Sequence, residues 1–427
     1  MIYPKVLIIS HNALSNNDNM GKTLASFIRQ FPKDNVAQLF LHEGNPNSDL
    51  CSNYYKFTDK DALKSVFLRW NNGKRLTEIE NPDTAPQLHK GAIYRLGRKK
   101  KPLVSFFRDA VWRLSNSFNR KLKKWLKEFD PDVIFFACSD SKFSYRLTRK
   151  IVLYLKKPLA LCCFDDYYLN CNYSTCAFGK AYFRGFLKEV FKTFDLAKLT
   201  FAVNEKMSEA YRNFFDREFP VLYTSAECQL SDSMFDDRHG ICYLGGLGYG
   251  RDKQLVALGK ALREGKYPNL PKHIDVYSPE NNDAVLRELT KENGIVFHGS
   301  VSHNEVSRVI KSSKALIHTE SFEKKIIERT KFSLSTKIPE SLGSGALLIA
   351  YGPKEVASID YLLKNDAAVV SDDVQSLLTE VSSVFSDKRK YQGCIEKQKQ
   401  LYLRNHTVSA VSKVFIEQIN KIVHLQS

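Results

Sequence analysis

The sequence Ser333-Leu-Ser-Thr-Lys-Ile-Pro-Glu-Ser-Leu-Gly-Ser-Gly-Ala-Leu-Leu-Ile-Ala-Tyr-Gly352 predicts a polar loop, a short helix and a buried strand in succession. Pro339 suits the first turn of the helix, because its missing N–H leaves no hydrogen bond unmade there. The apolar run Ala346–Tyr351 has the length of a buried strand. A polar loop that leads into a helix start is typical of an anion-binding site.

The residues around this helix start supply the groups that an anion needs. Ser335, Thr336 and Lys337 would offer a phosphate two hydroxyls and an ammonium, beside free backbone N–H groups and the positive end of the helix dipole. Glu340 lies in the same turn and can accept hydrogen bonds from paired hydroxyls such as those of a ribose. The structural alternative is that Glu340 favours the dipole of its own helix while Lys337 is solvated.

Length and composition predict a globular protein of two domains. The chain has 427 residues, 43% of them hydrophobic and 26% charged, which is too long for one ordinary core. The 64 Lys and Arg against 47 Asp and Glu leave a net charge of +17, which favours an anionic partner. Nine cysteines without paired spacing indicate reduced thiols, and Cys171 and Cys176 have no His cluster that would complete a zinc site.

The sequence lacks the pattern of a targeting or membrane-spanning segment. Its start leads directly into a strand, without a charged region followed by a long apolar run. The most apolar stretch near the middle, Ile151–Phe164, is interrupted by Lys156 and Lys157 and is too short to span a bilayer. We therefore expect a cytoplasmic protein.

Short apolar runs alternate with amphipathic helical patterns along the chain, as they do in βαβ units. Val221–Gly240 lacks this periodicity and is the predicted interdomain linker. We predict an α/β fold with a first domain at 1–225, a second at 226–405, and a C-terminal helix within 406–427 that crosses back to the first. The predicted strands are Lys5–Ser10, Asp132–Ala137, Pro158–Phe164, Gly240–Leu244, His273–Tyr277, Ile295–His298, Ala315–His318, Ala346–Tyr351 and Ala367–Val370.

Doubly wound domains bind ligands at the carboxyl ends of their strands. The loop Gly245-Gly-Leu-Gly-Tyr-Gly-Arg251 follows a strand, so Gly245 and Gly246 would let backbone approach a diphosphate while Arg251 adds charge. The alternative is a flexible turn with a solvated Arg. His11 and His318 also follow predicted strands, and His318 is one of the predicted donor-binding residues; the alternative is that a lone histidine at such a place is structural.

Three motifs carry a resemblance to a known family. They are Tyr243-Leu-Gly-Gly-Leu with Arg251, Phe297-His-Gly-Ser-Val301, and Ala315-Leu-Ile-His-Thr-Glu-Ser-Phe322 followed by Ser335-Thr-Lys-Ile-Pro-Glu340. With them, the chain from Tyr243 to about Ala350 resembles the carboxy-terminal domain of GT-B glycosyltransferases, specifically the family 4 type of bacterial surface-polysaccharide assembly. Pro131–Ile134 and Val203–Met207 agree more loosely with the amino-terminal domain. The resemblance implies two Rossmann-like domains that face a central cleft.

The resemblance also implies a role for each matching position. Glu340 would bind the ribose of a nucleotide-sugar donor, while Arg251, Lys337 and the Ser335–Thr336 turn hold the diphosphate. The backbone of Gly299 and Val301 would border the base. Gly21 would let the first helix of the amino-terminal domain face the phosphates.

One departure from the family concerns the donor sugar. The family usually has two Glu residues separated by seven others, and we assign the first of these positions to Ser333. Glu320 or Glu323 would then have to reach the sugar instead.

The chemistry implied by the resemblance needs neither a metal nor a cofactor, since the nucleotide-sugar is itself the donor substrate. Fixed cations and a helix N-terminus would stabilise the negative charge on the departing β-phosphate. The resemblance implies retention at the anomeric carbon. Asp165 and Asp166 follow a predicted strand and could orient an acceptor hydroxyl or act as a base; their structural alternative is to cap the turn at Tyr167–Tyr168.

The segment Arg95–Lys127 carries twelve Lys and Arg against the single Asp109, which gives it a charge of +11. Basic residues interleaved with aromatic ones suit an interfacial helix on anionic lipid. The structural alternative is a helix that covers its own sheet, with Phe106, Trp112 and Phe118 inward and a solvated basic face. No nucleic-acid motif accompanies the segment, so we expect no nucleic-acid partner. The predicted membrane and acceptor patch is Arg98, Lys99, Lys100, Lys101, Lys123 and Lys124.

The sequence thus predicts a cytoplasmic, peripherally membrane-associated enzyme that moves a sugar from a nucleotide donor to a saccharide or polyprenyl-diphosphate-linked acceptor in surface-glycan synthesis. A second prediction, favoured by Ser333 in place of a carboxylate, is a catalytically inactive scaffold of the same fold. Such a scaffold would bind anionic lipid or a partner glycosyltransferase.

Overall fold

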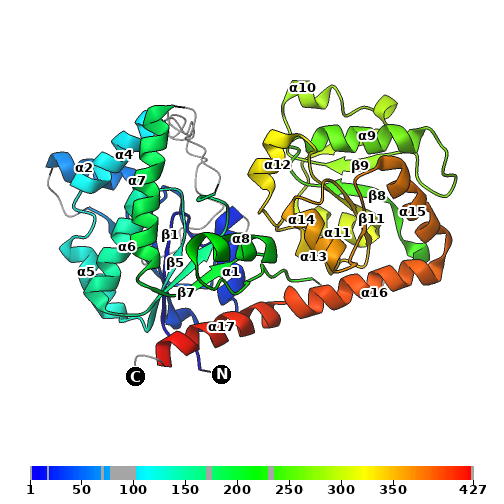
Figure 1. The fold of residues 1–427 in the computed structure, drawn as a ribbon. Coiled ribbons are helices and arrows are strands. Elements are labelled where there is room, and N and C mark those ends of the chain that lie inside the picture. The colour runs from blue at the N-terminus through cyan, green and yellow to red at the C-terminus, as the bar shows by residue number, and fades with distance from the viewer. Residues whose placement is uncertain are drawn as a thin grey trace. The chain divides into compact units, whose positions relative to one another are not determined.

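The computed structural model describes residues 2–16, 19–68, 72–76, 102–169, 176–228 and 235–424 (Figure 1). The chain forms two compact units. Met1–Tyr223 with Val411–Ser427 is the N-terminal unit, and Thr224–Ala410 is the C-terminal unit. Each contains a sheet of mostly parallel strands with helices packed on it. None of the described helices combines the length and the apolarity needed to pass through a bilayer.

The sheet of the N-terminal unit has the strand order β4-β3-β2-β1-β5-β6-β7. Its neighbouring strands are parallel except for β4, which pairs antiparallel with β3 at the edge. The strands are β1 (Val6–Ser10), β2 (Val36–Phe40), β3 (Asn53–Lys56), β4 (Lys74–Leu76), β5 (Val133–Ala137), β6 (Leu159–Cys163) and β7 (Ala197–Ala202). The helices are α1 (Asn19–Ile28), α2 (Asp59–Leu68), α4 (Pro102–Leu114), α5 (Arg120–Phe129), α6 (Lys142–Leu155), α7 (Ala177–Phe194), α8 (Glu205–Phe215) and α17 (Val408–His424).

The sheet of the C-terminal unit has the order β10-β9-β8-β11-β12-β13, and every neighbouring pair is parallel. Its strands are β8 (His239–Leu244), β9 (Ile274–Tyr277), β10 (Ile295–Gly299), β11 (Ser313–Thr319), β12 (Leu347–Tyr351) and β13 (Val369–Ser371). Its helices are α9 (Arg251–Arg263), α10 (Asp283–Leu286), α11 (His303–Ser312), α12 (Lys324–Thr330), α13 (Ile338–Leu342), α14 (Ala357–Lys364), α15 (Val374–Ser386) and α16 (Lys388–Asn405).

Both sheets contain a point where the strand order reverses. The chain moves outward in one direction from β1 to β3 and then returns to place β5 on the other side of β1. In the same way β8, β9 and β10 run to one edge, and β11 returns beside β8. The loops after the two central strands therefore diverge and leave a crevice at the carboxyl edge, which is where doubly wound sheets bind ligands.

Local sequence explains where many helices begin. Asn119 and Asn204 each accept a hydrogen bond from the backbone N–H three residues on, at 3.0 and 2.9 Å. Ser302 and Glu305 form a reciprocal capping box at the start of α11. The strands β1, β2, β5, β6 and β12 are buried along their whole length, as expected of parallel strands covered on both faces.

All the strands predicted from the sequence are confirmed, with shifts of one or two residues at their ends. Four strands are additional, namely β2, β3, β4 and β7. In β2 the polar Gln38 interrupts the apolar run, yet it is buried because its amide bonds Ser10 Oγ at 2.8 Å and the backbone N–H of Leu14 at 2.9 Å. In β7 the exposed Lys198 interrupts the pattern in the same way.

The last helix completes the core of the N-terminal unit. Phe415 of α17 is fully buried, and its ring centroid lies 5.1 to 6.1 Å from those of four aromatic residues of that unit. The partners are Phe27 of α1, Phe31 just after α1, Phe135 of β5 and Phe201 of β7. Aromatic contacts at these separations add to the area buried.

We predict that Phe415→Ala lowers the free energy of unfolding by about 3–5 kcal/mol, because it leaves a cavity among four rings. Val414→Ala is the matched control, since Val414 is 38% exposed and its loss should cost no more than about 0.5 kcal/mol. Urea denaturation followed by circular dichroism measures both. Equal midpoints for the two variants would contradict this role for α17.

Candidate active site

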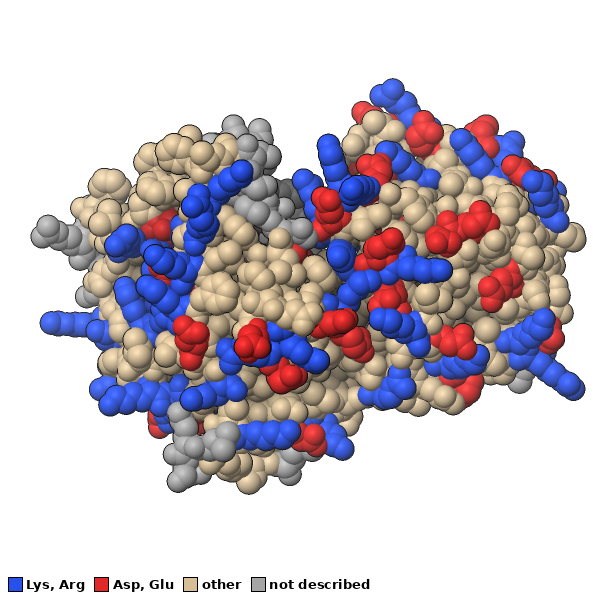
Figure 2. Space-filling model, viewed as in Figure 1, with Lys and Arg blue, Asp and Glu red and all other residues tan. Residues whose placement is uncertain are grey.

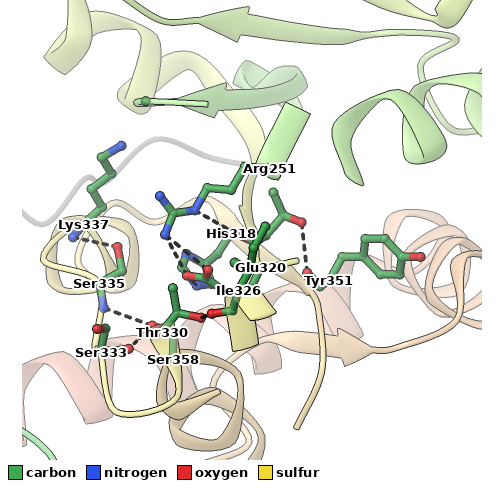
Figure 3. A network of polar contacts seen from close by, with 12 residues as sticks. Arg251, His318, Glu320, Ile326, Thr330, Ser333, Ser335, Lys337, Tyr351 and Ser358 are labelled. Atoms are coloured by element: carbon green, nitrogen blue, oxygen red, sulfur yellow. Dashed lines mark hydrogen bonds and ion pairs between the residues drawn. The ribbon is translucent and has the colours of Figure 1, made fainter. Parts of the chain in front are cut away.

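The candidate site lies in the C-terminal unit, at the carboxyl ends of β8 and β11. These neighbouring strands flank the reversal of strand order. Figure 3 shows the side chains that converge there from the loops after the two strands and from the turn before α13. The sequence predicted this edge from glycines, cations and carboxylates that are far apart along the chain.

The loop after β8 makes room for a cation. Gly245 has a φ of +144°, which favours glycine, and its backbone N–H donates to the Tyr277 carbonyl at 2.9 Å. A Cβ atom on Gly245 would lie 1.4 Å from Lys337 Nζ, whereas one on Gly246 would meet nothing within 4 Å. A side chain at position 245 would be strained by this φ and would push aside the end of the Lys337 side chain, which passes directly over the backbone.

Lys337 connects the turn before α13 to the end of β8. Its Nζ donates to the Leu244 carbonyl at 3.0 Å and lies 5.8 Å from the centre of the Tyr243 ring. Lys337 is an exposed residue. The contact with Leu244 holds the ammonium at the carboxyl edge of the sheet.

Arg251 and Glu320 form an ion pair between the two loops. Arg251 Nη2 lies 3.0 and 3.2 Å from the carboxylate oxygens of Glu320, and its Nε donates to the Thr319 carbonyl at 3.2 Å. The Glu320 side chain is only 3% exposed. His318 Nε2 lies 3.4 Å from Glu320 Oε1, but the two atoms are not aligned as a hydrogen bond. Glu320 thus fixes the guanidinium at the start of α9.

The environment sets the charges of this pair. Burial alone would raise the pKa of Glu320, but the contact with His318 and the charge of Arg251 outweigh it and hold the pKa below its usual value. Burial opposes the charge of Arg251 as well, yet Glu320 raises its pKa above the ordinary value. Both groups therefore stay ionised at neutral pH.

A second set of contacts shapes the turn before α13. Ser358, at the start of α14, accepts a hydrogen bond from the Ser335 backbone N–H at 3.0 Å and donates to the Ser333 carbonyl at 3.0 Å. Ser335 Oγ accepts from the Lys337 N–H at 3.4 Å, while Thr336 is exposed. Ser358 was not predicted, because nothing in the local sequence links it to a turn more than twenty residues earlier.

Glu340 occupies the first turn of α13, as predicted, and is half-buried. Its backbone carbonyl accepts a contact of 3.7 Å from Cys228 Sγ. The assignment of the other family Glu to Ser333 is one residue off, since a separation of seven residues from Glu340 falls on Phe332. Phe332 is buried and apolar, so neither position supplies a carboxylate.

The two acids proposed as replacements are both engaged. Glu320 holds Arg251, and Glu323 pairs with Lys253 at 2.6 Å on the surface. Glu320 is therefore a positioning residue for Arg251 in this structure. Its part in binding a donor sugar stays a prediction.

The predicted base-binding residues lie at the end of β10, two strands from β8. Gly299 has a φ of +73°, and its carbonyl accepts from the Ser278 N–H at 2.9 Å. Beside it the Tyr277 and His298 rings stack at 4.4 Å, with an angle of 8° between their planes. Val301 follows this turn and is half-buried. The two residues share the carboxyl edge with the cations, and their contact with a base stays a prediction.

Of the three predicted site residues in the N-terminal unit, Gly21 and Asp166 have structural roles. A Cβ atom on Gly21 would lie 2.4 Å from the Ala13 carbonyl oxygen, so close packing of α1 on its preceding loop explains this glycine. Asp166 is buried and accepts from the backbone N–H groups of Tyr168 and Leu169 at 3.2 and 3.0 Å, which matches the structural alternative. Asp165 is exposed after β6. Burial lowers the pKa of His11 to about 4, so this histidine is neutral at pH 7.

The predicted basic patch is only partly described. Arg98, Lys99, Lys100 and Lys101 lie outside the described residues. Lys123 and Lys124 stand on α5, whose apolar side chains, Leu122, Trp125, Leu126 and Phe129, are buried. Lys123 Nζ lies 4.7 Å from the Phe118 ring centre, and Lys124 is exposed. This helix fits the structural alternative, with a covered apolar side and a basic face outward. Nowhere in the described ranges do three or more His, Cys, Asp or Glu gather to hold a metal.

Comparisons with solved structures establish the fold. The chain is similar to HepE from Anabaena, solved with UDP, with a TM-score of 0.63 and 11% identity over 98% of this chain and 100% of HepE. It is also similar to the trehalose 6-phosphate synthase of Burkholderia multivorans, with a TM-score of 0.63 and 10% identity over 99% and 100% of the two chains. A glycosyltransferase of Rickettsia africae gives 0.59 and 12% identity over 99% of each chain.

These likenesses cover both units, and they confirm the predicted α/β architecture as the GT-B fold. No family model matches the sequence, and no curated protein matches it. The identities are too low to carry over a substrate or a site residue. The arguments for function therefore rest on the side chains.

We predict that Glu320→Gln lowers the free energy of unfolding by about 3 kcal/mol, since it leaves the Arg251 charge without its partner. Glu323→Gln is the matched control, because its exposed pair should contribute at most about 1 kcal/mol. Urea denaturation at pH 7 measures both. Equal losses in the two variants would contradict the role of Glu320.

The same pair predicts a pH dependence. The folded pKa of Glu320 is lowered, so its stabilisation is present above the unfolded value of about 4.3 and disappears as pH falls through the folded pKa. The stability difference between the unmodified protein and Glu320→Gln should therefore narrow below about pH 4. A difference that stays constant from pH 7 to pH 3 would show that the charge of Glu320 does not matter.

Proposed function

We propose that this protein is a glycosyltransferase that moves a sugar from a nucleotide-sugar to a saccharide or lipid-linked saccharide acceptor. The single observation that carries the proposal is the pair of cations at the switch point. Arg251 is held by Glu320 and Lys337 by the Leu244 carbonyl, so both are in position before a ligand arrives. HepE, which shares the fold, has been solved with UDP and with UDP-glucose. A nucleoside diphosphate is the anion that such an edge would bind.

The proposed reaction uses these charges where negative charge develops. The bond between the anomeric carbon and the β-phosphate oxygen breaks, and the guanidinium and ammonium stabilise the departing diphosphate. The acceptor oxygen bonds to the anomeric carbon and gives its proton to a phosphate oxygen of the leaving group, with retention of configuration. No metal is needed, because both cations belong to the chain. Hydrogen bonds from the ribose hydroxyls to Glu340 would orient the donor.

The acceptor side of the proposal depends on the N-terminal unit. Its switch point lies between β1 and β5, where Asp140 follows β5 and His11 follows β1. Asp165 follows β6, the next strand, and its exposed carboxylate is the candidate for orienting an acceptor hydroxyl. We propose a role in cell-surface polysaccharide synthesis, with the enzyme in the cytoplasm at the inner face of the membrane.

We predict that Glu340→Ala weakens UDP binding by about 10- to 100-fold, the cost of losing hydrogen bonds to a charged group, and abolishes sugar transfer. Glu355→Ala, at an exposed position after β12, should change neither. Calorimetric titration with UDP, GDP and ADP measures binding, and release of nucleoside diphosphate measures turnover. An unchanged dissociation constant for Glu340→Ala would remove the ribose role.

We also predict that Gly245→Ala weakens binding of the same nucleotide at least tenfold, because a methyl group there must displace Lys337 Nζ. Gly393→Ala on α16, outside the predicted donor site, is its control, since the added methyl group meets nothing within 4 Å. If both variants bind nucleotide equally well, Lys337 does not hold the diphosphate from its observed position.

A catalytically inactive scaffold is the second candidate function. The absence of a carboxylate at Phe332 and Ser333 favours it, together with the engagement of Glu320 by Arg251. Nucleotide binding without any turnover of UDP-sugars, in the presence of a lipid extract that contains acceptors, would support the scaffold over the enzyme.

A further inference from the structure

Helix α4 presents an apolar stripe to solvent. Leu103, Phe106, Phe107 and Leu114 are 57% to 73% exposed. Their spacing of three, four and seven or eight residues places them on one side of the helix. The sequence-based alternative put Phe106 inward, so this part of it is wrong. Single exposed apolar residues are ordinary, but a periodic stripe indicates a surface that something covers.

The opposite side of α4 is firmly attached to the protein. Trp112 is buried, stacks on Phe143 at 4.1 Å, and donates from Nε1 to Asp59 at 2.6 Å. Arg108 Nε donates to the same carboxylate at 2.9 Å, and Asp109 pairs with Arg146. These contacts fix the rotation of the helix, so the stripe faces outward because of specific bonds on the inner side.

Helix α2 extends the apolar surface. It packs against α4, and its Leu63 and Phe67 are 43% and 76% exposed. The Asn116 N–H, two residues after Leu114, donates to Ser65 Oγ at 3.1 Å, which places the ends of the two helices together. We name the six side chains on α2 and α4 the apolar face: Leu63, Phe67, Leu103, Phe106, Phe107 and Leu114.

Two exposed cations adjoin residues of this face. Lys64 and Arg113 are exposed beside Leu63 and Leu114. The acids of the two helices are engaged, since Asp59 and Asp109 bind arginines and Asp61 accepts from the Thr58 N–H at 2.9 Å. Asp59, Asp61 and Asp109 therefore have partners other than Lys64 and Arg113.

Helix α5 begins six residues after α4 ends and adds an open groove, the cationic groove, which is lined by Arg120, Lys123, Lys124, Lys127, Glu128 and Tyr154. Figure 1 shows α2, α4 and α5 along one side of the N-terminal unit. In Figure 2 the surface over α2 and α4 is mostly tan, and blue side chains gather next to it over α5. Apolar and cationic surfaces thus adjoin on one side of this unit.

We propose that this side of the N-terminal unit docks on an anionic lipid bilayer, with the apolar face in the boundary between headgroups and acyl chains and the cationic groove on the headgroups. A bilayer fits because it offers apolar depth and negative charge over adjoining areas. The proposal deepens the membrane association included in the proposed function. It uses none of the donor-site residues, so either can fail alone.

The first test is sedimentation of the full chain with vesicles of phosphatidylcholine containing 30% phosphatidylglycerol. The double variant Phe106→Ser/Phe107→Ser should bind at least tenfold more weakly, since two exposed rings no longer enter the boundary region. Leu363→Ser/Leu403→Ser, at exposed positions of the C-terminal unit, is the matched control and should bind normally. Equal vesicle binding by both double variants would overturn the proposal.

The second test separates charge from insertion. Arg120→Gln/Lys124→Gln/Lys127→Gln, at three cations of the cationic groove, should weaken binding by about fivefold for each cation at low salt, with a smaller effect at high salt. Phe107→Trp should show quenching of its fluorescence by brominated acyl chains, while Leu403→Trp should not. Loss of salt dependence with no quenching at Phe107→Trp would exclude the bilayer as the occupant.

The third measurement addresses a protein occupant and the integrity of the donor site. If Phe106→Ser/Phe107→Ser converts an oligomer to a monomer in sedimentation velocity and leaves vesicle binding intact, the apolar face is a contact between copies and the proposal fails. Thermal stabilisation by UDP should be the same in this variant and the unmodified protein. Normal vesicle binding without any UDP effect would instead reject the donor site alone.

Discussion

The buried ion pair between Arg251 and Glu320 is the constraint on which the candidate site depends. It joins the start of α9, which follows β8, to the end of β11, and so holds together the two loops that diverge at the switch point. Removing two charges from water is costly, and the pair persists because Arg251 Nε also finds the Thr319 carbonyl and both loops are anchored to neighbouring strands. The guanidinium of Arg251 is therefore already fixed at the carboxyl edge of the sheet, and a bound phosphate would not have to order it.

Lys337, the second cation of the candidate site, is also held in place by the protein, but by a backbone carbonyl instead of a carboxylate. Lys337 reaches the Leu244 carbonyl over a residue that has no side chain, and Ser358 ties down the turn from which Lys337 departs. Neither contact requires a ligand. Charges that are already oriented need little reorganisation when negative charge develops nearby. The proposed sugar transfer would benefit from this, because negative charge develops on the departing nucleoside diphosphate.

The sequence predicts much of this arrangement, because buried parallel strands leave a strong apolar signal and Pro339 and the glycines mark the turns between them. It does not predict how the polar groups pair. From the sequence, Glu320 could equally have faced a ligand. Only the structure shows that its carboxylate pairs with Arg251. Ser358 and the Leu244 carbonyl act across long separations in sequence. Strands β2 and β7 were not predicted because the polar residues Gln38 and Lys198 interrupt their apolar runs. The structure accommodates Gln38 through tertiary hydrogen bonds, and Lys198 through exposure on an edge strand. The orientation of α4 depended on Asp59 and Phe143, which the helix's own sequence does not contain.

The path of the chain has a consequence for biogenesis. Phe415, which fills the middle of an aromatic cluster in the N-terminal unit, belongs to a helix made after the whole C-terminal unit. During translation the rings of Phe27, Phe135 and Phe201 lack this aromatic partner until the C-terminal unit has been synthesised. The N-terminal unit thus begins before the C-terminal unit in sequence but is completed after it. In a chain shortened before Val411, the N-terminal unit would expose this aromatic cluster and be prone to aggregate.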